Sequence, residues 1–282
     1  MKIYNDCFPC ILRGALDTAR LATDDTLIHR EILIRTMEKL SAGKLLDPPP
    51  VIAQNTQNQI RKLTGINDPY KKLKVKYNQF AKKNLPELQG LIDNSENPFE
   101  TAVKIAIAGN IIDFGTISDK GETFFFKKIK NTIMGTIKGN IPLLEKRIAK
   151  ADKILWLGDN TGEIVFDSLL LGQINTNKVT YAVRGNPILN DATMEDAVDA
   201  GITRIVKVID NGADIPGTFL TSCSSQFKDE YKSADLIISK GQGNYETLDH
   251  CDKRIAYLFI VKCQVVADYS GFVQGDSVVL ML

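Results

Sequence analysis

The sequence has very little histidine. Only His29 and His250 occur among its 282 residues. This scarcity argues against a histidine-rich zinc enzyme and against a Ser-His-Asp hydrolase, because both need histidine at the reacting centre. Any chemistry that this chain performs would therefore depend on carboxylates, amides and lysine.

The chain also lacks a large net charge and a long apolar run. Its formal charge of +1 at pH 7 gives no reason to expect nucleic acid or an anionic membrane as a partner. No apolar run approaches the roughly 20 residues that a membrane-spanning helix needs, and the opening MKIYND lacks the apolar core of a signal peptide. We therefore expect a cytoplasmic protein that binds neither membranes nor nucleic acid. The oligomeric state stays open.

Cysteine is present in an odd number, which argues against a disulfide framework. Cys7 and Cys10 form a Cys-x-x-Cys pair, whose spacing suits a soft metal or a redox couple. Because the sequence contains no second pair, Cys263 is the candidate third ligand of a second metal site. Cys223, Cys251 and His250 could join it only through folding. The alternative is two reduced cysteines at the start of a helix.

The distribution of apolar residues predicts helices first and alternating strands and helices afterwards. Helical spacing occurs over residues 10–21, 26–42, 51–64, 70–91 and 98–112. From residue 153 onward, strands are predicted at 153–158, 178–183, 204–209, 236–239, 255–262 and 277–282, the last as an edge strand, with helices at 162–171, 190–200 and 218–231. This alternation predicts an α/β fold: an all-helical domain over residues 1–95 and a Rossmann-like, mostly parallel sheet domain over residues 96–282.

Ligands of such sheets bind beyond the carboxyl ends of the strands. After the first predicted strand come Asp159 and Asn160, followed by Glu163. Their oxygens suit Mg²⁺ or Mn²⁺ better than zinc, and the amino terminus of the next helix favours an anion. The alternative is that Asp159 and Asn160 serve only as a helix cap.

Polar turns follow three more predicted strands. Arg184 ends the second strand and could bind a phosphate, and Asp191 could be a third metal ligand or a helix cap. Residues 210–214 follow the third strand and could line a pocket or form an ordinary turn. Lys240 begins a glycine-rich turn, 240–244, that could hold a phosphoryl group. It is not a Walker A loop, in which the lysine follows the glycines. Together the four turns predict one shared site.

The combination of motifs resembles the DUF89 family, the metal-dependent damage-control phosphatases. The matching segments are GDNTGE at 158–163 with Asp167, RGNP at 184–187, NDAT at 190–193, KGQGN at 240–244, CFPC at 7–10 and AGNIIDFG at 108–115. They occur in order over nearly the whole chain. The paired cysteines resemble those of the archaeal and bacterial branch of the family.

The resemblance implies hydrolysis of phosphate monoesters with Mn²⁺, Mg²⁺, Co²⁺ or Ni²⁺. It implies a metal held by Asp159, Asn160 and Asp191, and an active-site lysine at Lys240. Asn110 and Asp113 match the family's amino-terminal active-site segment. The implied substrates are small phosphorylated metabolites such as sugar phosphates or phosphopantetheine-like compounds.

From these assignments we expect a division of roles in the site. Lys240 and Arg184 would neutralise charge on the phosphoryl oxygens, and Glu163 or Asp113 would orient the attacking water or take its proton. The substrate-binding residues would be Arg184, Asn110, Gly241, Gly243 and Asn244. A covalent aspartyl-phosphate is the less favoured variant, because the aspartates are assigned to the metal.

Two other functions remain open from the sequence. A nucleotide- or S-adenosylmethionine-using transferase would have a glycine-rich loop after the first strand and an acidic residue at the end of the second, whereas this chain has Asp159-Asn160 and Arg184 there. A non-catalytic protein that binds a phosphometabolite or a metal would show tight binding without turnover.

Overall fold

The computed structural model describes residues 1–42, 47–111, 117–248 and 252–281. In these ranges seven strands form one sheet in the order β1-β7-β6-β5-β2-β3-β4. The strands are β1 (Ile137–Gly139), β2 (Ile154–Leu157), β3 (Val179–Val183), β4 (Lys207–Asp210), β5 (Leu236–Lys240), β6 (Ile255–Ile260) and β7 (Ser277–Met281). Strands β2 to β6 are parallel, whereas β7 runs antiparallel to β6 and parallel to β1.

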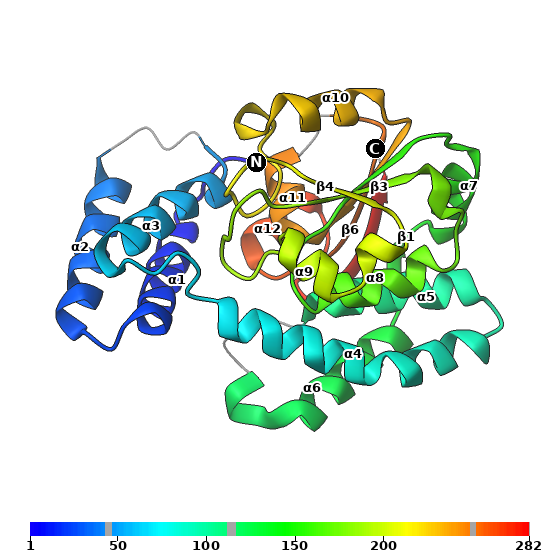
Figure 1. Ribbon diagram of the computed structural model, residues 1–282, viewed down its shortest axis with the longest axis horizontal. Helices are drawn as coiled ribbons and strands as arrows, with labels where there is room; N and C mark the ends of the chain where they lie inside the picture. The colour runs from blue at the N-terminus through cyan, green and yellow to red at the C-terminus, as the bar shows by residue number, and fades with distance from the viewer. Residues whose placement is uncertain (43–46, 112–116, 249–251, 282) are drawn as a thin grey trace.

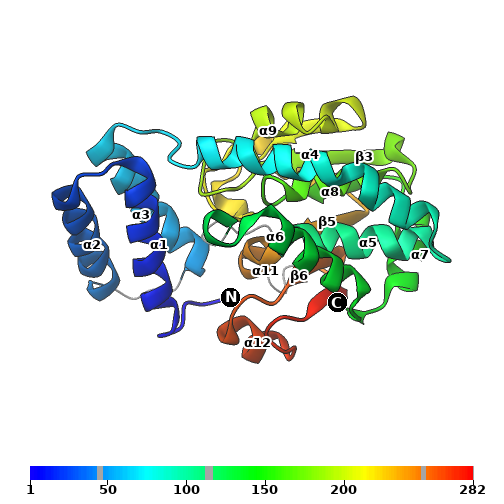
Figure 2. The ribbon, with the colours of Figure 1, turned by 90° about the horizontal axis from the view of Figure 1, so that it is seen from below.

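Helices surround this sheet and extend to one side of it (Figures 1 and 2). They are α1 (Cys7–Ala22), α2 (Thr26–Ser41), α3 (Pro49–Thr64), α4 (Lys71–Asp93), α5 (Pro98–Ala108), α6 (Ile117–Met134), α7 (Ile141–Lys150), α8 (Glu163–Leu171), α9 (Met194–Asp199), α10 (Ser225–Ser233), α11 (Gly241–Leu248) and α12 (Gln264–Ser270). A short 3₁₀ turn, η1 (Gly109–Ile111), follows α5. No helix in the described ranges has both the length and the apolar character to cross a membrane.

The sheet is buried on both faces, which explains the continuous apolar runs of its strands. Side chains alternate between faces along a strand, so Trp156 of β2 packs in the core that α4 to α8 cover. Its neighbour Leu157 packs in the core on the other face, with Phe227 of α10 and Tyr245 of α11. The predicted α/β class with a mostly parallel sheet and amino-terminal helices is confirmed.

Helices α1 to α3 form a separate bundle beside the sheet, coloured blue in Figure 1. The bundle has its own small cores, with Ile11 and Ile52 in one and Ile32 and Ile60 in the other. Helix α4 behaves differently, because its Tyr77 belongs to the large core beneath the sheet. The domain boundary at residue 95 stays a prediction. Helix α4 precedes that residue in the chain, yet it packs against the sheet and not with the α1–α3 bundle.

The structure contains elements that the sequence did not reveal, among them the helices α6, α7 and α12. Strand β7 is not an edge strand, because the short β1, which the sequence did not reveal, pairs with its outer side. The glycine-rich segment after β5 is not a free turn but the first turn of α11. Local glycine content suggests a turn, but packing of Tyr245 and Leu248 in the core stabilises a helix there.

The order of the strands determines where a ligand can bind. From β2 the chain proceeds to β3 and then β4 on one side, and it returns to β5 on the other side of β2. The carboxyl ends of β2 and β5 therefore diverge at a topological switch point, which is the usual ligand position in open α/β sheets.

Candidate active site

Asp159 and Asn160 follow β2 directly at this switch point. Both are buried, with 6% and 5% of their surfaces exposed. One carboxylate oxygen of Asp159, Oδ2, accepts hydrogen bonds from Asn160 Nδ2 at 2.7 Å and from Asn110 Nδ2 at 2.9 Å. Asn110 lies in η1, so the segment before α6 reaches the turn after β2.

Asp191 lies beside the same turn. A short antiparallel bridge joins Asn160 to Asp191, and the next residue, Ala192, donates its backbone N–H to the carbonyl of Asp159 at 2.7 Å. The structure thus brings together the three predicted metal ligands. Burial raises the pKa of Asp191, although the charge of Arg184 opposes this rise.

Only glycine fits at position 241. Its φ is +76°, and a Cβ atom there would lie 1.8 Å from Asp159 Oδ2. The first residue of α11 therefore packs directly against the proposed metal ligand. Gly243 has a different place: it lines a neighbouring cavity.

Arg184 is enclosed by protein groups. Its Nε donates to Asp191 Oδ2 at 2.6 Å, and its guanidinium also lies 3.7 Å from Asp159 Oδ1. The terminal nitrogens donate to Thr218 and to Asn244 Oδ1. Asn244 in turn donates to the carbonyls of Gly158 and Lys240, which ties α11 to the ends of β2 and β5.

Lys240 is fully buried at the end of β5. Its Nζ contacts three acceptors: the carbonyl of Ala106 at 3.0 Å, Glu163 Oε1 at 2.8 Å and Asp167 Oδ1. Although burial alone would lower it, the pKa of Lys240 is raised above its usual value by the charges of Asp167 and Glu163. Lys240 is therefore a buried cation between two carboxylates.

Glu163, the first residue of α8, completes the cluster. Its Oε2 accepts from Asn110 Nδ2 at 2.6 Å and from Asn160 Nδ2 at 3.4 Å, while its other oxygen faces Lys240. Burial, and then the charges of Asp191 and Glu163, raise the pKa of Asp159 well above its usual range. The site thus holds more negative than positive charge.

The chemistry of these residues fits a hard divalent cation. Ionised, the buried side chains would carry four negative and two positive charges: Asp159, Glu163, Asp167 and Asp191 against Lys240 and Arg184. Asn110 Oδ1 is buried and accepts no hydrogen bond. An oxygen atom that could bind a cation therefore lies without a partner beside Asp159. Within the described residues, no group of three or more His, Cys, Asp and Glu side chains alone is arranged to hold a metal. Amide oxygens of Asn160 and Asn110 would therefore have to contribute.

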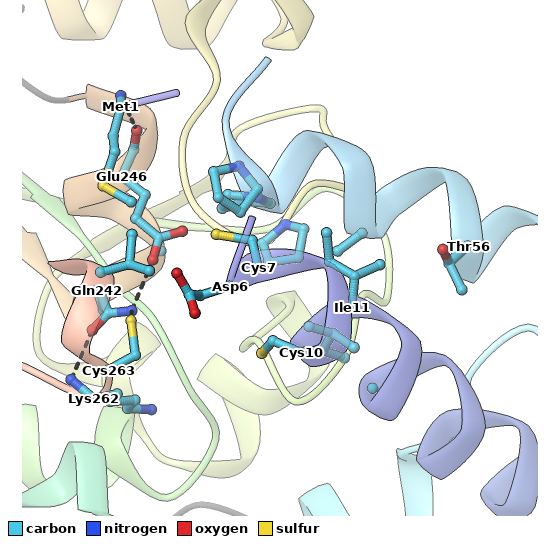
Figure 3. A pocket seen from close by; sticks show the side chains of 18 of the residues that line it. Met1, Asp6, Cys7, Cys10, Ile11, Thr56, Gln242, Glu246, Lys262 and Cys263 are labelled. Carbon is cyan, nitrogen blue, oxygen red and sulfur yellow. Dashed lines mark hydrogen bonds between the residues drawn. The ribbon is translucent and has the colours of Figure 1, made fainter. Parts of the chain in front are cut away.

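Two cavities adjoin the site. One, of about 560 Å³, lies between the α1–α3 bundle and α11, and Gln242 and Gly243 line it next to Gly241 (Figure 3). The other, of about 530 Å³, is lined by Asn110 and by residues after β6. Lys262 lines both. The sequence analysis did not single out Lys262, although its position after a parallel strand was a usable signal.

The predicted cysteine cluster is brought together only in part. Cys7, Cys10 and Cys263 all line the larger cavity, from α1 and from the loop before α12 (Figure 3). Burial raises the pKa of the Cys7 thiol. Because these described thiols do not form a metal-binding group with neighbouring His, Cys, Asp or Glu, the second metal stays a prediction. Asp113, Cys251 and His250 lie outside the described residues.

The turn after β4 has a structural role in the described contacts. Asn211 Oδ1 accepts backbone N–H groups of Gly185 and Ala213, and Asp214 pairs with Arg61 of α3 at 2.9 Å. This turn therefore supports the loop that leads to Asp191, and it helps attach the helical bundle to the sheet.

Comparison with known proteins places the chain in a family. The model of the damage-control phosphatase ARMT1-like domain matches residues 3–278. A damage-control phosphatase of Archaeoglobus fulgidus is 33% identical over 99% of this chain and 98% of its own, and an uncharacterized protein of Methanocaldococcus jannaschii is 38% identical over 99% and 95%. The crystal structure of a DUF89 family protein from Pyrococcus horikoshii superposes with a TM-score of 0.89, at 30% identity, covering 100% of this chain and 99% of that one. The chain belongs to the damage-control phosphatase ARMT1-like family, as its DUF89-like motifs predicted.

Proposed function

We propose that this protein is a metal-dependent phosphohydrolase that cleaves phosphate monoesters of small metabolites, such as sugar phosphates or phosphopantetheine-like compounds. The observation that carries the proposal is the excess of buried carboxylates around Asp159, with the unpartnered Asn110 Oδ1 beside it. An excess of two negative charges in a buried site is costly unless a cation compensates it.

Asp159, Asn160 and Asp191 would hold the divalent ion, Mn²⁺, Mg²⁺, Co²⁺ or Ni²⁺. When bound, such an ion polarises a phosphoryl oxygen and makes water more acidic. Arg184 would hold Asp191 and Asp159 in place through its contacts at 2.6 and 3.7 Å. The metal identity and the ligand set are part of the proposal.

Glu163 is the described residue best placed to take a proton from the attacking water. One of its oxygens faces the amides of Asn110 and Asn160, beside Asp159, and the other is held by Lys240. A carboxylate held at both oxygens keeps a defined orientation, which favours general base catalysis. Asp113 remains the alternative base predicted from the sequence.

The organic part of the ester would occupy the cavity next to Gly241. Its volume of about 560 Å³ falls in the range typical of small-molecule sites. The cavity walls come from both the α1–α3 bundle and the sheet body, so the bundle would help select the substrate.

Release of inorganic phosphate tests this proposal. A panel of phosphate esters is incubated with and without Mn²⁺, Co²⁺, Ni²⁺ and Mg²⁺, and we expect turnover only with metal. Asp159→Ala should abolish it while circular dichroism shows a folded protein, and the exposed control Asp229→Asn should retain the wild-type rate. Full activity of Asp159→Ala would contradict the site assignment. Tight ester binding without turnover would instead indicate a sensor.

A further inference from the structure

Leu189 has an unusual backbone conformation close to a proposed metal ligand. Its φ is +45°, and among the described residues other than glycine it is the one with a positive φ. This left-handed region is disfavoured for a residue with a Cβ atom, so glycine or asparagine is the usual choice there. The chain thus carries a bulky apolar residue, two positions before Asp191, where a smaller residue would cost less free energy.

Hydrogen bonds fix the backbone around Leu189. The N–H of Asp191 donates to the carbonyl of Ile188 at 3.0 Å, which closes a turn around Leu189 and Asn190. The carbonyl of Asn190 in turn accepts from the N–H of Thr161 at 2.9 Å, and Thr161 belongs to the turn after β2. The surrounding contacts therefore hold Leu189 in its strained conformation, and strained residues of this kind cluster at functional sites.

Core packing does not explain why leucine occupies this position. Within the described ranges, Leu189 belongs to none of the four apolar cores and is not packed against any of them. It is partly exposed and lines the cavity of about 560 Å³. Ile11 and Pro50 of the bundle line the same cavity, as does Gly243, two residues after the glycine that packs against Asp159. An apolar side chain next to the carboxylate cluster is thus available to a ligand in this cavity.

We propose that Leu189 is a specificity-determining residue that contacts the organic group of the substrate, and that this group contains a hydrocarbon segment. The inference rests on the proposed phosphatase function. Burial of such a segment against Leu189 and the apolar side chains of the bundle would raise affinity by up to about fourfold for each methylene group. The phosphoryl group would stay with the charged groups around Asp159, so the two parts of the ester can be tested separately.

Binding of alkylphosphonates, which carry no ester bond to hydrolyse, tests the inference without depending on turnover. Calorimetry with Mn²⁺ present compares methylphosphonate with n-hexylphosphonate, and the wild-type protein should bind the longer probe at least about tenfold more tightly. Leu189→Gly should lose about tenfold in affinity for n-hexylphosphonate, because an apolar contact is removed. Its affinities for methylphosphonate and for Mn²⁺ should stay within about twofold of wild type.

Two further variants serve as controls for the probe measurements. Leu189→Met keeps an apolar side chain of similar volume, so it should bind both phosphonates within about threefold of wild type. Val198→Ala removes an apolar side chain that is 56% exposed on α9, outside the cavity. It should change neither affinity.

Urea unfolding separates the role of the side chain from the strain of the backbone. Leu189→Ala keeps a Cβ atom in the left-handed conformation, whereas Leu189→Gly does not. Leu189→Gly should therefore unfold at a higher urea concentration than Leu189→Ala, although both should lose affinity for n-hexylphosphonate to a similar extent. The reverse order of stability would overturn the strained conformation on which the inference depends.

The outcomes distinguish this inference from the proposed function. If no ester is hydrolysed with any metal, the phosphatase proposal fails, while the phosphonate titrations still decide the role of Leu189. The inference is wrong if the wild-type protein binds n-hexylphosphonate no more tightly than methylphosphonate, or binds neither. It is also wrong if Leu189→Gly keeps the wild-type affinity for n-hexylphosphonate or weakens both probes equally, since an equal loss would place its effect on Asp191 rather than on the organic group.

Discussion

The hydroxyl group of Tyr181 donates a hydrogen bond of 2.7 Å to Asp167 Oδ2, deep beneath the active-site turn. The indole of Trp156 donates to the same oxygen at 3.2 Å, and the other oxygen of Asp167 accepts from Lys240. Since Lys240 also pairs with Glu163, Tyr181 is connected through two side chains to the proposed general base. All of these groups are buried.

Tyr181→Phe should therefore slow the reaction, even though the side chain at this position would not contact the substrate. Loss of one hydrogen bond, worth about 1 kcal/mol, frees Asp167 to shift and loosens Lys240 and Glu163. We expect kcat to fall several-fold, up to about tenfold, with KM and phosphate affinity within about twofold of wild type. Steady-state kinetics on an ester that the wild-type enzyme hydrolyses provides the measurement.

Tyr257→Phe is the matched control for Tyr181→Phe. Tyr257 is also buried in a parallel strand, and its hydroxyl donates to the carbonyl of Leu248 at 2.7 Å, outside the carboxylate cluster. It should lose similar stability but keep kcat. Equal losses of kcat in the two variants would show that the effect is one of general stability rather than of positioning.

Gly241→Ala tests the contact between α11 and the turn that carries Asp159. A methyl group at this position would lie 1.8 Å from Asp159 Oδ2, so the carboxylate must move. A misplacement of about 1 Å in a catalytic group can cost roughly 100-fold in rate, and we expect at least that loss in metal-dependent phosphate release.

Gly271→Ala separates this displacement from backbone strain. Gly271 has φ +78°, nearly the same as the +76° of Gly241, but nothing lies within 4 Å of its Cβ position. Both variants should lose about 1 to 2 kcal/mol of stability from the left-handed backbone, measured by urea unfolding, but only Gly241→Ala should lose activity. Retained activity in Gly241→Ala would contradict the described geometry.

Glu246 should make the protein less stable as pH rises. Burial raises the pKa of Glu246 from 4.5 to about 7, against the hydrogen bond from Gln242 and the charges of the amino terminus and Lys262. Between these values the folded protein holds a proton that the unfolded chain has released, so stability falls with pH. Below about pH 4.5 Glu246 is protonated in both states and costs no stability. Above about pH 7 its ionisation lowers the free energy of unfolding by the full amount, on the order of 3 kcal/mol.

Glu246→Gln should remove this dependence, because the amide keeps the shape of the protonated acid. Urea unfolding should show the variant more stable than wild type at pH 8 and nearly equal to it at pH 4.5. The exposed Glu145→Gln on α7 is the control. An advantage of Glu246→Gln that does not change between the two pH values would contradict the shifted pKa.

Much of this architecture follows from local patterns. Strand and helix periods depend on near neighbours in the chain, so the segment from 153 onward could be read as alternating strands and helices. The short β1 was not predicted, because three residues are too few to show an alternating pattern. It forms only by pairing with β7. The helix at 241–248 was missed because its stability comes from core contacts rather than propensity.

The sequence by itself determined that Asp159, Asn160, Arg184, Asp191 and Lys240 would meet, because carboxyl ends of parallel strands share one edge of a sheet. Only the tertiary structure decided what each could do there. The ammonium group of Lys240 is enclosed by the carbonyl of Ala106, 134 residues away, and by Asp167, 73 residues away. No local pattern encodes such contacts, since they arise when helices from distant parts of the chain pack on the same strand. Burial encloses the lysine that was expected to bind phosphate and pairs it with Glu163 and Asp167 instead.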